Sequence, residues 1–122
     1  DMRIPIAYAM SYPHRMRNTL PPLNLLQVRE LTFLPPDSET FPCLSLAYSA
    51  LKLGQTYPAV LNAANEVAGQ AFLSGRIGFN QISTLVQRAL ENHTPRPIRT
   101  LEDVMEADTW ARSQCTRWID ER

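Results

Sequence analysis

The sequence carries no excess of either charge and no long apolar run. Its 122 residues contain 12 Lys plus Arg and 12 Asp plus Glu, so the formal net charge is zero. A neutral chain lacks the basic surface with which proteins bind nucleic acids or anionic membranes, so we expect neither nucleic acid nor a membrane among its partners. No apolar segment reaches the roughly 20 residues that span a bilayer. The first ten residues, DMRIPIAYAM, also lack the basic start of a targeting signal, which predicts a chain without a leader or an anchor.

Cysteine is scarce as well. Cys43 and Cys115 are the only two in the sequence, they lie far apart, and neither belongs to a pattern with metal-ligand spacing. Both fall on apolar helical patterns, where a free cysteine behaves as a small apolar side chain. We therefore expect two reduced thiols in the core of a cytosolic protein rather than a disulfide or a zinc site.

Motifs that carry chemistry are missing too. The sequence has no GxGxxG fingerprint, no cluster of carboxylates with metal spacing and no Ser/His/Asp set. Its two histidines, His14 and His93, stand alone in loops flanked by prolines, which is typical of solvent-exposed side chains rather than of metal ligands or proton shuttles. The sequence therefore predicts no catalytic residue and no metal ligand.

The prolines divide what is present. Residues 1–12 have the apolar spacing of one short helix, in which Pro5 fits only the first turn and Pro13 marks the end. Residues 13–36 mix prolines, charges and one β-leaning stretch, Leu31 to Leu34, without a sustained period. This pattern predicts an extended linking arm with a short strand, which needs another surface to pack on.

Four helical patterns follow, and they predict an all-α fold over residues 37–122. The helices are expected at about 41–53 with Thr40 as a cap, at 58–74, from near 80 to the interruption NHTPRP, and from Thr100, which forms a capping box with Asp103. Connections this short favour antiparallel neighbours, so the four helices should form one small assembly. The apolar faces predicted for the first, third and fourth helices are Leu44, Ala47, Tyr48 and Leu51; Ile82, Leu85, Val86, Ala89 and Leu90; and Leu101, Val104, Ala111, Cys115 and Trp118.

The stretch LNAANE places polar residues in the middle of an apolar helix. Asn62, Asn65 and Glu66 lie at i, i+3 and i+4, so they share one stripe, and apolar positions flank that stripe on both sides. Such a stripe is predicted to be largely buried, where it would hydrogen-bond the backbone of a neighbouring segment such as the arm. The alternative, Glu66 as a general base oriented by the asparagines, needs a nucleophile, a metal or a cleft that the sequence does not offer.

The last helical pattern contains a charged pair on its apolar side. Asp108 and Arg112 lie four residues apart, the spacing at which an acidic and a basic side chain meet on a helix. We expect them to form an ion pair that is partly buried.

Three stretches carry a resemblance to a known family. In chain order, DMRIPIAYAMSYPHR, LTFLPPDSETFPCLSLAYSAL and PAVLNAANEVAGQAFLSGRIGF closely resemble the carboxy-terminal third of 1-deoxy-D-xylulose 5-phosphate reductoisomerases. By this resemblance residues 1–12 are the last helix of the central catalytic domain of an α/β enzyme, residues 13–36 the linking arm, and residues 37–122 the helical carboxy-terminal domain. The chain departs from the family pattern at Gly54-Gln55 and at Gly69, and a glycine inside a helix costs about 1 kcal/mol relative to alanine.

The resemblance also implies an activity for the larger protein. Members use NADPH and Mg²⁺ or Mn²⁺ to convert 1-deoxy-D-xylulose 5-phosphate to 2-C-methyl-D-erythritol 4-phosphate in the non-mevalonate isoprenoid pathway. By the resemblance, this chain retains one of the family's cofactor contacts, Met2, on the nicotinamide side of the site. We therefore expect this chain alone to be inactive. The expected partners are the remaining domains of the parent enzyme and, in a homodimer, a second copy of that enzyme. The expected location is the bacterial cytoplasm, or a plastid in an organism that has one. The competing hypothesis is a stand-alone helical module that binds a partner protein.

Overall fold

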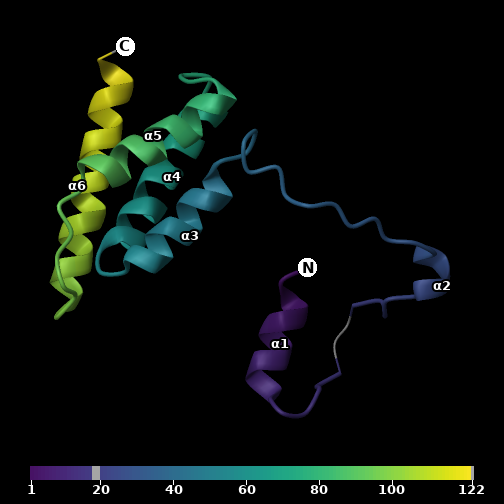
Figure 1. Cartoon of the computed structure of the whole chain (residues 1–122). Helices are drawn as coiled ribbons and strands as arrows, with labels where there is room; N and C mark the ends of the chain where they lie inside the picture. Colours follow the sequence, from purple (N-terminus) through teal and green to yellow (C-terminus); the bar gives the residue numbers. More distant parts are fainter. Residues whose placement is uncertain (18–19, 122) are drawn as a thin grey trace. The chain divides into compact units, whose positions relative to one another are not determined.

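The computed structural model describes residues 1–17 and 20–121. The chain divides into two compact units, Asp1–Leu34 and Pro35–Arg122, and each is described by itself. Six helices lie in the described part, and no strand does (Figure 1). The all-α class predicted from the sequence is confirmed.

The first unit contains the short helix that the sequence predicts. Helix α1 spans Arg3–Ser11, with Pro5 in its first turn. At its start the Asp1 carboxylate accepts a hydrogen bond from the Arg3 backbone N–H at 2.9 Å and pairs with the Arg3 guanidinium at 2.6 Å. At its end the Ser11 hydroxyl donates to the carbonyl of Ala7 at 2.9 Å. The helix buries none of its residues.

The arm differs from the expectation in two ways. A four-residue helix, α2 at Leu25–Val28, begins after Asn24, whose side chain accepts a hydrogen bond from Leu26 N–H at 3.0 Å. The short strand predicted at residues 31–34 is not formed. A strand requires a second strand as a hydrogen-bonding partner, and the described part of the chain supplies none.

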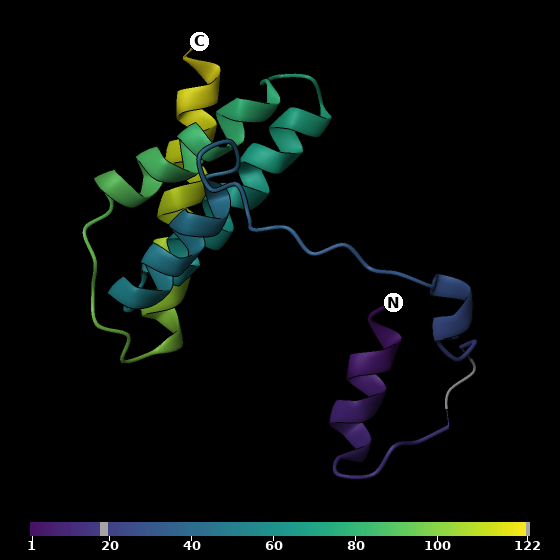
Figure 2. The ribbon, with the colours of Figure 1, turned by 45° about the vertical axis from the view of Figure 1, so that its right-hand side comes forward.

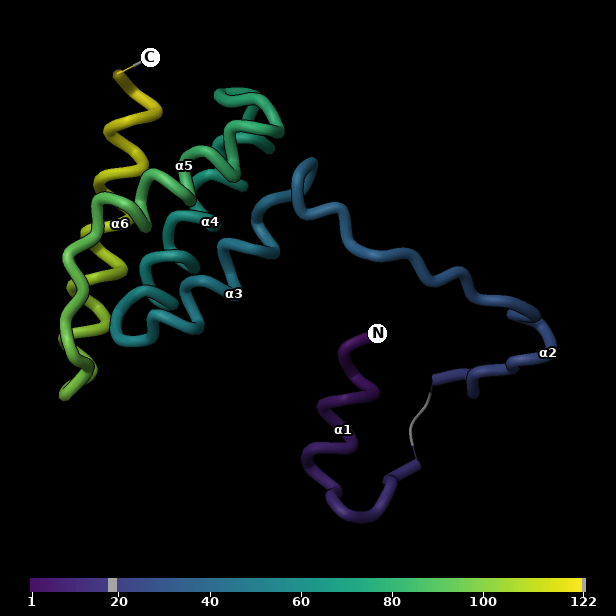
Figure 3. The backbone as a smooth tube through the Cα atoms, viewed as in Figure 1, coloured from purple at the N-terminus to yellow at the C-terminus, as the bar shows by residue number. Residues whose placement is uncertain are grey.

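The second unit contains the four predicted helices. They are α3 at Cys43–Leu53, α4 at Tyr57–Leu73, α5 at Phe79–Asn92 and α6 at Leu101–Asp120. Helix α4 packs against all three others (Figure 2). The chain reverses direction at each connection, as the backbone trace in Figure 3 shows. Each boundary that the sequence predicted lies within about two residues of the observed one, and the end of α6 was not predicted.

Small side chains on α4 build the core. Alanine lets neighbouring helices approach closely, and α4 contributes Val60 and four alanines that are at most 5% exposed. The predicted α5 stripe is buried from Leu85 onward, and α6 adds larger residues. The buried core residues are Ala50, Val60, Ala63, Ala64, Ala68, Ala71, Ile77, Leu85, Val86, Ala89, Leu90, Ala107, Ala111, Cys115, Trp118 and Ile119.

The predicted apolar face of α3 is wrong. Ala50 is buried and Leu46 packs on the core, whereas Tyr48 and Leu51, which belong to the predicted face, are 68% and 72% exposed. Two apolar faces overlap on this helix, and the helical period alone does not tell which one meets α4. The residue that caps the turn before α3 also differs from the predicted one. The Asp37 carboxylate, not Thr40, closes the preceding turn by accepting the Thr40 N–H at 2.9 Å.

The packing of α3 on α4 leaves the two cysteines in different environments. Cys115 is buried as expected, and burial raises the pKa of its thiol to about 11, so the thiol stays protonated at neutral pH. Cys43, predicted to be a core thiol, is exposed at the first position of α3, because α4 lies on the Leu46 and Ala50 side of that helix.

The start of α6 is capped as predicted. The Asp103 carboxylate accepts hydrogen bonds from Thr100 N–H at 2.9 Å and from Arg99 N–H at 2.8 Å. The backbone hydrogen bonds from Arg99 and Thr100 hold the pKa of Asp103 below its ordinary value. Among the described residues, no helix combines the length and the apolar character required to cross a bilayer.

Candidate functional site

Met2, the one predicted cofactor contact, lies at the N-cap of α1 and is 70% exposed. Its neighbours Asp1 and Arg3 are joined by their own ion pair. The thioether is therefore free to contact a further molecule, and its predicted role remains a prediction.

The polar stripe of LNAANE is exposed, contrary to the predicted burial. Asn62, Asn65 and Glu66 all lie on the open side of α4, and the Asn62 side-chain amide donates to the Glu66 carboxylate at 3.3 Å. Of the apolar positions beside the stripe, Val60 and the alanines are buried against the other helices, Leu61 and Val67 are only partly buried, and Phe72 is exposed. Among the described residues of this unit, the stripe bonds side chains, Asn62 to Glu66 and Glu66 to Arg112, rather than the backbone of a loop.

Arg112 joins α4 to α6 through two carboxylates. Its guanidinium donates to both oxygens of Asp108, at 2.7 and 3.1 Å, and to Glu66 at 2.6 Å. The predicted Asp108–Arg112 pair is confirmed, and Glu66 is an additional partner. The hydrogen bond that Glu66 accepts from Arg112, and to a smaller extent the one from Asn62, lowers the pKa of Glu66. The hydrogen bonds that Arg112 donates to Asp108 and Glu66 raise the pKa of Arg112. A carboxylate held ionised in this way is a weak base, which argues against catalysis by Glu66.

This ion pair stands at one end of an open groove between α4 and α6, about 700 Å³ in volume. Gly69 and Ile119 contribute to its lining, and Arg76, which pairs with Asp120, also lies along it. Besides the paired charges, uncharged polar side chains such as Asn65 and Gln70 and apolar ones such as Leu73 line the groove, and its charged groups are already paired with one another.

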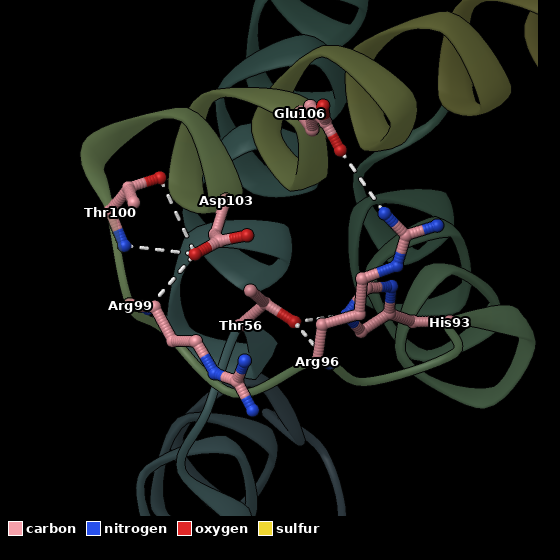
Figure 4. A network of polar contacts seen from close by, with 7 residues as sticks. All are labelled: Thr56, His93, Arg96, Arg99, Thr100, Asp103 and Glu106. Carbon is pink, nitrogen blue, oxygen red and sulfur yellow. Dashed lines mark hydrogen bonds and ion pairs between the residues drawn. The ribbon is translucent and has the colours of Figure 1, made fainter.

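A second polar cluster lies where the α5–α6 connection crosses the start of α4 (Figure 4). Thr56 is fully buried, and its Oγ1 lies 2.7 Å from His93 Nε2. The same oxygen accepts the backbone N–H of Arg96 at 3.2 Å, and the Arg96 guanidinium pairs with Glu106 at 3.1 Å. His93 is half-buried rather than solvent-exposed as expected, whereas His14 is exposed as expected.

Two aromatic rings flank the half-buried His93 imidazole. Its centroid lies 5.3 Å from the Tyr57 ring and 5.2 Å from the Trp110 ring. Burial, followed by the positive charge of Arg96, lowers the pKa of His93. The ring is therefore neutral at neutral pH. The proton of the buried Thr56 hydroxyl needs an acceptor, and His93 Nε2 lies 2.7 Å away, so we assign Nε2 of the neutral ring as that acceptor.

The Thr56–His93 distance is that of a nucleophile and its base, but the surroundings differ from those of a catalytic pair. Thr56 is 0% exposed, so a substrate cannot reach its oxygen. Thr56 borders a cavity of about 330 Å³ together with His93 and Trp110, but it presents no exposed surface to it. The charged side chains of Arg96 and Glu106, which also line this cavity, are paired with each other. The cluster can join three segments of the chain, and it offers no accessible nucleophile.

The sequence patterns did not reveal this cluster, because Thr56 and His93 are 37 positions apart. The available signal was the pair of prolines around Arg96, which restricts the connection to extended backbone. In the described part of the chain, no group of three or more His, Cys, Asp or Glu residues could hold a metal ion.

Taken together, these observations define a small helical domain with an alanine-rich core and polar joints between its helices. The chain belongs to the family described as the DXP reductoisomerase C-terminal domain, whose sequence model matches residues 1–114. The resemblance noted in the sequence is thereby confirmed.

Curated relatives and solved structures agree with this assignment. The 1-deoxy-D-xylulose 5-phosphate reductoisomerases of Desulforamulus reducens and Geobacter metallireducens are 55% and 51% identical over 119 residues, 98% of this chain and 31% of each relative. The Zymomonas mobilis enzyme in complex with NADPH has a TM-score of 0.86 at 41% identity over 98% of this chain. A DOX-P reductoisomerase in complex with NADPH, fosmidomycin and magnesium has a TM-score of 0.85 at 36% identity. The chain thus spans about a third of the length of the proteins it matches.

Proposed function

We propose that this chain is the carboxy-terminal structural domain of an NADPH- and metal-dependent reductoisomerase. The enzyme would convert 1-deoxy-D-xylulose 5-phosphate to 2-C-methyl-D-erythritol 4-phosphate in non-mevalonate isoprenoid biosynthesis. The observation that carries the proposal is 55% identity to a curated reductoisomerase along 98% of this chain. A structural role is supported by the paired charges and the inaccessible Thr56 hydroxyl of the second unit.

The domain boundaries belong to the same proposal. Residues 1–12 would close the central catalytic domain, residues 13–36 would form the arm, and residues 37–122 would form the helical domain. Two observations support this division. The boundary between the two compact units lies between residues 34 and 35, two positions from the proposed boundary between the arm and the helical domain. The first unit buries none of its described residues. A segment without a core of its own requires another surface.

The cofactor and partner assignments are also proposals. NADPH, which supplies the hydride, and Mg²⁺ or Mn²⁺ would bind mainly to the other domains, with Met2 against the nicotinamide side. The remaining domains and a second copy of the enzyme would be the partners, in a bacterial cytoplasm or a plastid. An exposed thioether at the start of α1 supports the role of Met2, because methionine adapts its shape to flat apolar rings.

A chimera tests the proposed function. This chain replaces the matching 32% of the Zymomonas mobilis enzyme, and NADPH oxidation is measured with 1-deoxy-D-xylulose 5-phosphate and Mg²⁺. We expect substrate-dependent oxidation by the chimera and none by this chain alone. The control is the same enzyme with the matching part deleted, which should be inactive. Equal activity of the deleted enzyme and the chimera would refute a structural role.

Met2 is tested in the same chimera. Met2→Ala should raise KM for NADPH, since it removes an apolar contact with the cofactor, and it should leave the thermal midpoint unchanged because Met2 is exposed. Met10→Ala, on the same helix and 78% exposed, is the matched control and should change neither quantity. If both variants behave alike, Met2 has no part in cofactor binding. No observation favours the stand-alone interaction module over this proposal.

A further inference from the structure

The connection between α5 and α6, residues 93–100, is fastened to two helices by a small set of contacts. His93 and the backbone N–H of Arg96 both reach Thr56 Oγ1, at the start of α4. The Arg96 guanidinium reaches Glu106 on α6, and the backbone N–H groups of Arg99 and Thr100 reach Asp103 on α6. The two hydrogen bonds on the α4 side of this attachment therefore both end on one buried hydroxyl (Figure 4).

That hydroxyl is satisfied by a neutral histidine and not by a protonated one. A threonine hydroxyl has one proton to donate and two lone pairs that accept. With neutral His93, Thr56 donates to Nε2 and accepts from Arg96 N–H, so both contacts are made. With protonated His93, both neighbours are donors, and the two contacts leave the Thr56 proton without an acceptor at a fully buried position. Burying an unsatisfied polar group is unfavourable.

The groups around His93 do not compensate for a positive charge on the ring. From α4 it meets Tyr57, and from α6 it meets the Trp110 ring. Arg96, on the same connection, is itself positive and opposes protonation. Asp103 and Glu106 line the same cavity from α6, but Asp103 accepts two backbone hydrogen bonds and Glu106 pairs with Arg96.

We propose that His93 and Thr56 form a pH-sensitive latch. At neutral pH the latch holds residues 93–99 against the start of α4, and protonation of His93 releases them. Release breaks the hydrogen bond from Arg96 N–H to Thr56 and opens the cavity beside Trp110. The device is built into the helical domain and is independent of the proposed reductoisomerase activity.

The direction of the pH effect follows from linkage. The pKa of His93 is lower in the folded protein than its ordinary value of 6.5, so between those two values the open state binds more protons than the latched state. The latched state therefore loses stability as pH falls through 6.5 toward the folded pKa. Below the folded pKa both states are protonated, and this group causes no further change.

Hydrogen exchange of the Arg96 amide tests the latch in the full chain, because that N–H is bonded to Thr56 and both of its neighbours are prolines. The measurement is its protection factor, corrected for intrinsic exchange, at pH 7.5 and pH 5.5. We expect protection to fall on acidification, by up to about tenfold for each unit by which the two pKa values differ. The protection factors of amides in the middle of α4 should not show this fall.

Three variants separate the latch from a general acid effect. His93→Gln keeps a polar side chain that cannot titrate, so the Arg96 amide should lose its pH dependence. His14→Gln alters the exposed histidine of the other unit and should behave like the parent chain. Thr56→Ser keeps the hydroxyl and should keep the pH dependence. If Arg96 protection is the same at both pH values in the parent chain, or falls equally in His93→Gln, the latch is overturned.

Discussion

The two units of the chain contain similar apolar residues and use them differently. In residues 35–122, α4 alone buries five residues, because α3, α5 and α6 pack around it. In residues 1–34, none of the described residues is buried, although this unit contains several isoleucines, leucines and tyrosines. In residues 1–17 and 20–34 the helices are one of nine residues and one of four, and helices this short are marginal in water without tertiary packing.

The comparison teaches that apolar content alone does not determine burial. A face becomes core only where a second element of the same unit can cover it, and α4 is long enough to contact three helices. The first unit lacks such an element in its described part. This is the expected behaviour of a segment that completes another domain, and it accords with the proposed assignment of residues 1–12 to the central domain.

The largest expected effect contrasts one leucine from each unit. Leu85 is 1% exposed in the core, whereas Leu26 is 88% exposed in α2. Leu85→Ala should lower the free energy of unfolding by about 2 to 5 kcal/mol, because it removes buried surface and leaves a cavity. Leu26→Ala should change it by less than about 0.5 kcal/mol. Urea unfolding followed by circular dichroism measures both, and equal losses would mean that the first unit has a core as well.

Arg112→Ala should have a smaller effect. The substitution removes the side chain that joins α4 to α6, so Asp108 and Glu66 both lose their cationic partner. Because all three side chains are partly exposed to water, we expect a loss of no more than about 1 kcal/mol, reduced further by high salt. Arg117→Ala, which alters an exposed pair on the same helix, is the control and should cost less. A loss that salt does not reduce would contradict this reading.

Gly69→Ala should stabilise the second unit. Gly69 lies in the interior of α4, and a Cβ built there meets no other atom within 4 Å. Alanine therefore adds helix propensity without a clash, which is worth about 0.5 to 1 kcal/mol. The thermal midpoint should rise accordingly. Gly75→Ala is the opposite control and should destabilise, since Gly75 adopts a φ of +72° that favours glycine.

Asn65→Leu should have the smallest effect in the isolated chain. Asn65 is exposed beside the α4–α6 groove, so its loss leaves no buried group unpaired. We expect a change of less than about 0.5 kcal/mol in the free energy of unfolding. The stripe was predicted from the sequence to be buried, and in that case the substitution would cost on the order of 1 to 3 kcal/mol. Urea unfolding distinguishes the two values.

Local patterns in the sequence predicted the helices well. The Asp103 cap of α6 and the Asp108–Arg112 pair connect residues within four positions, the α5 stripe repeats in steps of one to three positions, and the structure confirms each of them. Periodicity and capping residues are sufficient signals at that range. The resemblance to the reductoisomerase family rested on longer stretches and is also confirmed.

Contacts between distant segments were not predictable in the same way. The period of α3 did not tell which of its apolar faces packs against α4, and the period of α4 did not tell that the Asn65 stripe faces water. The cluster of Thr56 and His93 joins residues 37 positions apart, so no local pattern contains it. Each of these features depends on how whole helices stack, which a single sequence does not specify locally.

Hydrogen exchange over the whole chain tests the central claim most directly, because it compares the two units in one sample. In the isolated chain, amides of α4, α5 and α6 should exchange slowly and together, through global unfolding of the second unit, while those of α1 should exchange close to intrinsic rates. In the Zymomonas mobilis chimera, α1 should become protected by the central domain. If α1 in the isolated chain is protected as strongly as α4, the first unit folds on its own, and the division into a dependent segment and a self-sufficient helical domain is wrong.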